Sequence, residues 1–182
     1  MEATELVLYN RSDLTGSERI FEGYIFSVRR DSLKKPDKEP ITREIVEHNG
    51  GVVICGQPDA DKVILIRQYR YPVDEEIIEL PAGRVEKGED RFLAAQRELT
   101  EETGYVAGTW SNLPPMYSAP GFCNELLTFY QATNLVFKGK NLDEDEETEV
   151  LIVTLKEAWQ MVKQERIRDA KTVAGLAVLS FA

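Results

Sequence analysis

Three glutamates on one predicted helix are the residues of this chain most able to do chemistry. Glu98, Glu101 and Glu102 lie within residues 90–103, a predicted helix that Asp90 or Glu89 can cap at its start and that ends before Gly104. At spacings of three and four residues, the three carboxylates share one arc of roughly 100° beside an apolar stripe. Because like charges at such spacings repel one another, this face requires a cation.

Two kinds of cation could meet that requirement. Arg97 can reach Glu101 four residues later, but one guanidinium cannot neutralise three carboxylates and Glu89 upstream. Hard divalent ions prefer oxygen ligands, and Mg²⁺ commonly binds one or two protein carboxylates and leaves its other positions to water and phosphates. The alternative is an acidic helix face that is simply exposed to solvent.

The loop and the helix together resemble the Nudix box, the signature of the Nudix hydrolase family. Gly83 is followed after five residues by Glu89, and seven more residues lead to Arg-Glu-Leu-Thr-Glu-Glu-Thr-Gly at residues 97–104. Tyr105 stands where the family usually has an aliphatic residue, and every fixed position matches. So many fixed positions make the pattern far more specific than a lone glycine motif. The resemblance implies hydrolysis of a nucleoside diphosphate linked to another group.

The same resemblance implies a set of metal ligands. Glu98 and Glu102 would bind the metal directly, together with the backbone carbonyl of Ala82. Glu101 would be either a further ligand or a carboxylate held in place by Arg97. Two or three Mg²⁺ ions, with Mn²⁺ able to substitute, would bridge the diphosphate, and one would polarise the attacking water.

The general base is expected on a later acidic loop, residues 142–147. In ADP-ribose pyrophosphatases of the family the base lies on such a loop, whereas in many other members it lies inside the box. Glu144 is the first choice and Glu146 the second, with Glu146 also able to bind a metal. An acidic run of this kind can also be merely solvated.

A second motif indicates the subfamily. Pro120 lies sixteen residues beyond Gly104, in a Ser-x-Pro-Gly-Phe context that resembles ADP-ribose pyrophosphatases; alone it could be a simple turn. The predicted activity is hydrolysis of ADP-ribose and related nucleoside diphosphate sugars. Two alternatives are a hydrolase that prefers GDP-mannose or UDP-sugars and a non-catalytic sensor of ADP-ribose. The complete set of box glutamates argues against the sensor.

Substrate contacts follow from the resemblance more loosely. Arg70 would meet a phosphate or the terminal ribose, and Glu125 would touch the ribose or position the base. The adenine would be held by residues of the N-terminal strands, across a dimer interface. The full set of predicted substrate-binding residues is Arg70, Arg43, Glu44, Tyr24, Phe26, Glu125, Pro120 and Gly121.

Hydropathy patterns predict an α/β fold. Strands are expected at residues 19–32, 41–48, 51–55, 62–69, 77–80, 126–135 and 150–155, helices at 90–103, 156–167 and 172–181, and irregular structure at 108–118. This order favours a mixed sheet covered by helices on both faces, the α/β/α sandwich of the family. Residues 1–45 would form N-terminal antiparallel strands and residues 46–182 the catalytic domain. By themselves these strands would be ordinary ones; the resemblance to ADP-ribose pyrophosphatases implies that they mediate a homodimer, with strand exchange as a further option.

Composition limits the binding partners and the cellular compartment that we expect for this protein. A net charge of −10 argues against nucleic acid or an anionic membrane surface as a partner. Two cysteines fit a reducing compartment, and we find neither a signal peptide nor an apolar run of the roughly 20 residues that span a bilayer. We therefore expect a cytoplasmic protein, and interpret the single histidine, His48, as structural.

Overall fold

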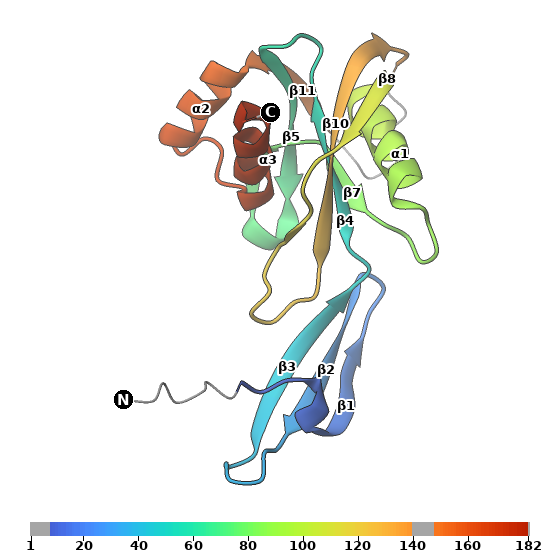
Figure 1. Cartoon of the computed structure of the whole chain (residues 1–182). Coiled ribbons are helices and arrows are strands. Elements are labelled where there is room, and N and C mark those ends of the chain that lie inside the picture. Colours follow the sequence, from blue (N-terminus) through green and yellow to red (C-terminus); the bar gives the residue numbers. More distant parts are fainter. Residues whose placement is uncertain (1–7, 140–147, 182) are drawn as a thin grey trace. The chain divides into compact units, whose positions relative to one another are not determined.

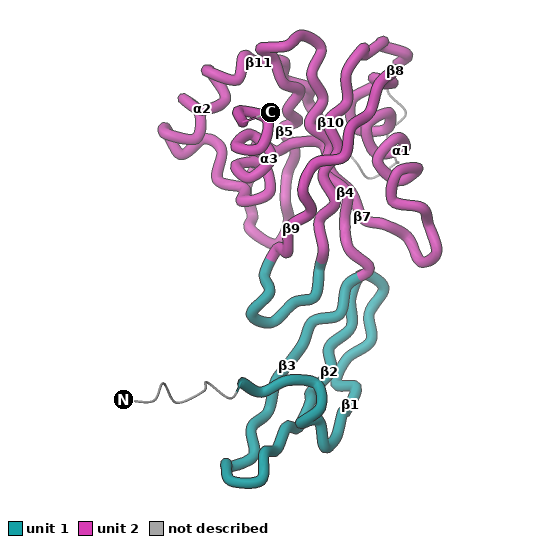
Figure 2. The backbone as a smooth tube through the Cα atoms, in the orientation of Figure 1, with its two compact units in different colours: residues 1–48, 119–125 teal, residues 49–118, 126–182 magenta. Residues whose placement is uncertain are grey.

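The computed structural model describes residues 8–139 and 148–181 (Figure 1). The chain divides into two compact units (Figure 2). The smaller unit consists of residues 1–48 and 119–125, and the larger unit of residues 49–118 and 126–182.

The smaller unit is a three-stranded antiparallel sheet. After the short helix η1 (Arg11–Asp13), its strands β1 (Leu14–Glu22), β2 (Phe26–Leu33) and β3 (Ile41–His48) lie in the order β1-β2-β3. The single strand predicted at residues 19–32 is wrong, because the chain turns at residues 23–25 and Gly23 N donates to Phe26 O at 3.0 Å. The apolar alternation continues through this turn and conceals it.

The larger unit contains a mixed five-stranded sheet. Its strands β7 (Ala82–Arg84), β4 (Gly51–Gly56), β10 (Leu126–Phe137) and β8 (Tyr105–Asn112) lie in that order, and β9 (Met116–Tyr117) pairs with β10. β10 and β4 are parallel, whereas the other pairs are antiparallel. The irregular segment predicted at 108–118 is therefore wrong: β8 and β9 both pair with β10, and only the Pro-Pro stretch between them fits the prediction.

A second sheet and three helices complete this unit. Strands β11 (Glu149–Thr154), β5 (Lys62–Arg70) and β6 (Glu75–Glu79) form an antiparallel sheet, with η2 (Tyr71–Val73) between β5 and β6. The helices are α1 (Arg91–Thr103), α2 (Leu155–Lys163) and α3 (Ala170–Phe181). α2 ends earlier than the predicted residue 167, and Glu165 just beyond it has a left-handed backbone with φ 59°. None of the helices among the described residues is long and apolar enough to cross a membrane.

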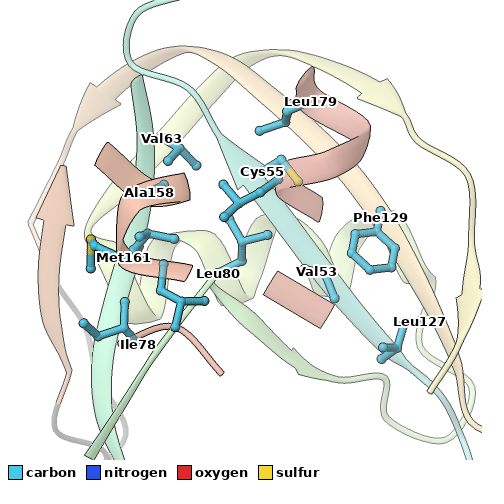
Figure 3. Packing of buried hydrophobic residues seen from close by; sticks show 13 residues of the cluster. Val53, Cys55, Val63, Ile78, Leu80, Leu127, Phe129, Ala158, Met161 and Leu179 are labelled. Carbon is cyan, nitrogen blue, oxygen red and sulfur yellow. The ribbon is translucent and has the colours of Figure 1, made fainter. Parts of the chain in front are cut away.

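Strand β4 shows why the sheet is covered on both faces. Its residues are all buried, and their side chains alternate between two hydrophobic clusters. Val52 and Ile54 pack with the buried face of α1, while Val53 and Cys55 join the cluster that contains residues of α2 and α3 (Figure 3). A strand buried on both faces reads as a continuous apolar run. The predicted sandwich of helices around a mixed sheet is confirmed.

Candidate active site

Helix α1 begins and ends where its sequence predicts. The Asp90 carboxylate accepts hydrogen bonds from Phe92 N at 2.9 Å and Leu93 N at 3.1 Å, so that Asp90, rather than Glu89, caps the helix. Gly104 ends the helix with a left-handed backbone, φ 77°. The helix therefore holds the three predicted glutamates in a fixed register.

Two of these glutamates are buried, which is rare for carboxylates. Glu98 is 8% exposed and Glu102 is 3% exposed. Glu102 Oε2 accepts a hydrogen bond from Ala82 N at 2.9 Å, which joins the helix to the loop that precedes it. Buried charges one helical turn apart are costly unless they are paired or bind a cation. This face of α1 therefore suits a cation.

Gly83 makes room for one of these carboxylates. A Cβ at Gly83 would lie 1.9 Å from the carboxyl carbon of Glu98, far inside any permitted contact. The glycine that opens the box thus leaves the space that the Glu98 carboxylate occupies, and a side chain here would displace that carboxylate. Sequence reasoning identified the glycine but not the partner.

Arg97 contacts three carboxylates. It donates to Glu98 at 2.8 Å and Glu101 at 2.9 Å through Nη1, and to Glu89 at 3.1 Å through Nε. The Glu89 pKa is lowered, chiefly by this hydrogen bond from Arg97. Burial acts to lower the Arg97 pKa, but the surrounding carboxylates outweigh it and the pKa is raised. The predicted Arg97–Glu101 contact is present, within a larger network.

The donor set suits a hard divalent ion. Among residues 8–139 and 148–181, no three acidic, histidine or cysteine side chains form a ready metal cage. Two buried carboxylates beside a backbone turn are nevertheless what Mg²⁺ commonly uses, because it leaves its remaining positions to water and substrate phosphates. Glu98, Glu102 and the Ala82 carbonyl are thus the groups that would hold it.

Arg70 lies close to this acidic face. It ends β5 and donates through Nε to Glu79 Oε2 at 2.8 Å. Burial acts to lower the Arg70 pKa, but the charges of Glu79, Glu102 and Asp169 raise it overall. The structure thus brings Arg70 within electrostatic range of Glu102. Its contact with substrate stays a prediction.

The other predicted substrate residues belong to the smaller unit. Its turn after β1 carries Tyr24, β2 begins with Phe26, β3 carries Arg43 and Glu44, and residues 119–125 carry Pro120, Gly121 and Glu125. Backbone hydrogen bonds at 2.8 Å and 3.1 Å tie this last segment to Val46 of β3. His48 Nδ1 lies 3.3 Å from Glu125 Oε1, so the histidine interpreted as structural touches a predicted site residue.

The predicted bases, Glu144 and Glu146, lie outside the described residues. Thr148, soon after them in sequence, is described: its hydroxyl donates to the backbone carbonyl of Glu102 at 2.8 Å. The chain that follows the predicted base is therefore attached to the end of α1.

Comparison with known proteins identifies the family. Residues 48–176 match the NUDIX domain model, so the chain belongs to the NUDIX family. The predicted family is confirmed.

Individual relatives cover most of the chain. It is 39% identical to the methanol dehydrogenase activator of Bacillus methanolicus over 165 residues, which cover 90% of this chain and 89% of that protein. It is 37% identical to the ADP-ribose pyrophosphatase of Bacillus subtilis, with 89% of each chain covered, and 36% identical to that of Mycobacterium tuberculosis, with 88% and 79% covered. A solved ADP compounds hydrolase shares the fold, with a TM-score of 0.84, 22% identity and coverage of 98% and 96%.

Proposed function

We propose that this protein hydrolyses the diphosphate bond of ADP-ribose and related nucleoside diphosphate sugars, giving a nucleoside monophosphate and a sugar phosphate. The observation that carries the proposal is the pair of buried carboxylates, Glu98 and Glu102, beside Ala82 in a NUDIX domain. The names of the Bacillus subtilis and Mycobacterium tuberculosis relatives support ADP-ribose as the first substrate to test. GDP-mannose is the main alternative, because a GDP-mannose pyrophosphatase of Escherichia coli is 33% identical.

The chain's own residues divide the work as follows. Glu98, Glu102 and the Ala82 carbonyl would hold Mg²⁺, which when bound neutralises phosphate charge and makes water more acidic. Arg97 orients Glu98 and Glu101 through its hydrogen bonds. Arg70 offers its guanidinium to a phosphate oxygen, a group that it can bind with two parallel hydrogen bonds.

The reaction needs one proton acceptor. Water adds to phosphorus, the bond from that phosphorus to the bridging oxygen breaks, and the proton from water passes to a carboxylate. We propose Glu144 as this acceptor and Glu146 as the alternative. Glu144→Gln should lower kcat by about 100-fold or more, the usual range for loss of a general base, with little change in binding of ADP-ribose. An unaffected Glu144→Gln variant would move the role to Glu146 or to the helix.

The decisive experiment follows product formation. AMP and ribose 5-phosphate should appear from ADP-ribose with Mg²⁺ or Mn²⁺, and formation should stop when EDTA is added. A panel of ADP-ribose, ADP-glucose, GDP-mannose and UDP-glucose would rank the sugars. Tight binding of ADP-ribose without products would identify a sensor instead.

A second candidate is regulation of an alcohol-oxidising enzyme. It is favoured by the 39% identity to the methanol dehydrogenase activator of Bacillus methanolicus. Adding the purified protein to methanol dehydrogenase should raise the oxidation rate if this activity is shared. The Glu102→Gln variant, added in parallel, would show whether such an effect needs the hydrolytic site.

We also propose a homodimer formed through the smaller unit, in the cytoplasm. Supporting this, the unit exposes large apolar side chains: Ile20 is 45% exposed, Phe21 49%, Ile25 51% and Phe26 41%. The rings of Phe21 and Phe26 lie 5.7 Å apart, and exposed apolar groups that gather on a surface commonly mark an interface. Sedimentation equilibrium of the wild type and of Phe21→Glu should give a dimer and a monomer respectively; a monomeric wild type would refute the proposal.

A further inference from the structure

A buried carboxylate outside the proposed metal site connects three elements of the larger unit. Glu79, the last residue of β6, is 2% exposed. Its Oε2 accepts hydrogen bonds from Arg70 Nε at 2.8 Å and Gln68 Nε2 at 3.1 Å, both from β5. Its Oε1 accepts one from Lys171 Nζ, near the start of α3. A charge buried this deeply persists only when it is paired and hydrogen-bonded, and here it is.

The first branch from Glu79 leads to Arg70. Glu79 uses only Nε of this guanidinium, and among the described residues Nη1 and Nη2 have no hydrogen-bond partner. The side chain is 39% exposed and lies within the field of Glu102. Glu79 therefore fixes the plane of a guanidinium whose two outer nitrogens are available to a phosphate.

The second branch leads from Glu79 through helix α3 to the backbone of Leu80. Lys171 Nζ also lies 3.0 Å from Asp169 Oδ2, which accepts hydrogen bonds from Thr172 N at 2.9 Å and Thr172 Oγ1 at 2.6 Å. Because the single hydroxyl proton of Thr172 goes to Asp169, its lone pair is left to accept from Leu80 N, at 2.8 Å. Thr172 is fully buried, so water cannot replace it.

Leu80 opens the short turn that presents Ala82. Pro81 O accepts a hydrogen bond from Ile54 N at 2.8 Å, and Ala82 N donates to Glu102 at 2.9 Å. Three consecutive residues are thus each fixed by one hydrogen bond from a different element. Thr172 supplies the first of these, and Leu80 itself is buried in the core (Figure 3).

We propose that Glu79, Lys171 and Thr172 are positioning residues that join the phosphate-facing arginine to the turn carrying the metal-binding carbonyl. The inference rests on the proposed function and extends it. Glu79 lies at the junction, Arg70 ends one branch, and Ala82 ends the other. The two branches should separate in experiment: the Thr172 branch should affect metal binding, the Arg70 branch substrate binding, and Glu79 both.

Substitutions of Thr172 test the metal branch through metal binding alone, with no measurement of turnover. Thr172→Val keeps the shape of the side chain but leaves Leu80 N without its acceptor. Mn²⁺ binding, measured by electron paramagnetic resonance on the protein without substrate, should weaken by about tenfold, the usual effect of losing a supporting contact. Thr172→Ser should restore it, and KM for ADP-ribose at saturating Mg²⁺ should stay within twofold of wild type in both variants.

Substitution of Glu79 tests the junction of the two branches, because it should change both metal binding and substrate binding. Glu79→Gln cannot serve all three donors, so both KM for ADP-ribose and the Mn²⁺ dissociation constant should rise by about tenfold. Lys171→Met should weaken Mn²⁺ binding, and Lys171→Arg should recover part of it. Lys163→Met, an exposed lysine at the end of α2, is the matched control and should change neither constant.

The outcomes decide the proposal even if one variant fails to fold. Should Glu79→Gln not fold, the Thr172→Val and Thr172→Ser pair still decides the metal branch. Variants that lower the melting temperature but leave KM and Mn²⁺ binding within twofold would show a purely structural network and overturn the proposal. A wild type that binds Mn²⁺ but hydrolyses no nucleotide sugar would refute the proposed function, while the Thr172 result would still stand by itself.

Discussion

The two units differ in the carboxylates proposed to serve the reaction rather than in whether they bury charge: Asp31 of the smaller unit is also 8% exposed, and it pairs with Arg29 at 3.1 Å. In the larger unit, Glu79, Glu98 and Glu102 are buried, and the side chains of Glu79 and Glu98 are only 2% and 10% exposed. In the smaller unit, the predicted substrate residue Glu44 pairs with Arg30 across neighbouring strands, and the side chains are 66% and 44% exposed. An exposed ion pair contributes about 0–1 kcal/mol to the free energy of unfolding. Removing one partner of a buried ion pair lowers that free energy by about 3–5 kcal/mol.

The difference teaches where function constrains the sequence most. Burying carboxylates opposes folding, so their presence at the face of α1 is best explained by the ion that they would bind. The smaller unit can exchange exposed side chains with little effect on its stability. Substitutions at the buried carboxylates of the larger unit should therefore alter turnover, and those at the exposed predicted substrate residues of the smaller unit affinity alone.

The largest effect is expected at Glu102. Glu102→Gln removes the charge of a buried proposed metal ligand and should lower kcat by at least about 100-fold, more than the loss of a supporting residue. An amide of the same shape can still accept from Ala82 N, so circular dichroism should be unchanged. Glu76→Gln, at an exposed glutamate of β6, is the matched control. Near-normal turnover in Glu102→Gln would place the metal site elsewhere.

A smaller but still large effect is expected at Gly83. Gly83→Ala would force its Cβ against Glu98, whose carboxyl carbon would lie 1.9 Å away. Overpacking of this kind typically costs about 1–3 kcal/mol. Both the melting temperature and Mn²⁺ binding should fall. Gly16→Ala in the smaller unit, where nothing lies within 4 Å of the added Cβ, should change neither.

Local signals explain what could be predicted from the sequence. The bounds of α1 follow from a capping aspartate, a 3.6-residue period and a terminal glycine, all close together in the chain. The turn at Gly23 was missed because the apolar alternation runs through it. Strand β8 was missed because five of its eight residues are exposed and its pairing with β10 is a tertiary property.

The candidate active site also combines features that local sequence signals predict with features that depend on tertiary contacts. Glu98 and Glu102 could be identified from a motif, but the fit of Glu98 against Gly83 depends on how the β7 backbone approaches α1. The bonds from Lys171 to Glu79 and from Leu80 to Thr172 each join residues 92 positions apart. Only a charged residue between Ile78 and Leu80, in an otherwise apolar stretch, signalled that Glu79 has buried partners.

Substitution of the exposed predicted substrate residue Tyr24 in the smaller unit should change affinity alone. Tyr24 is 89% exposed, so Tyr24→Ala should leave the free energy of unfolding within about 0.5 kcal/mol of wild type. If the ring stacks on adenine as predicted, binding of ADP-ribose should weaken by about 1–3 kcal/mol, with kcat unchanged. Tyr24→Phe, which keeps the stacking face, should behave as wild type. Loss of kcat would instead tie this unit to the chemistry.

The smallest effect concerns acid stability and Glu89. Its folded-state pKa is lowered, chiefly by the hydrogen bond from Arg97, so the contact stabilises the fold above the unfolded-state pKa of about 4.3. This contribution should disappear as the pH falls through the lower folded-state pKa. The melting temperature of Glu89→Gln should therefore lie slightly below that of wild type at pH 7, and the difference should shrink as the pH falls below the unfolded-state pKa. A difference in melting temperature that keeps the same size from pH 7 down through the acid range would show that Glu89 stabilises the larger unit through packing rather than through its charge.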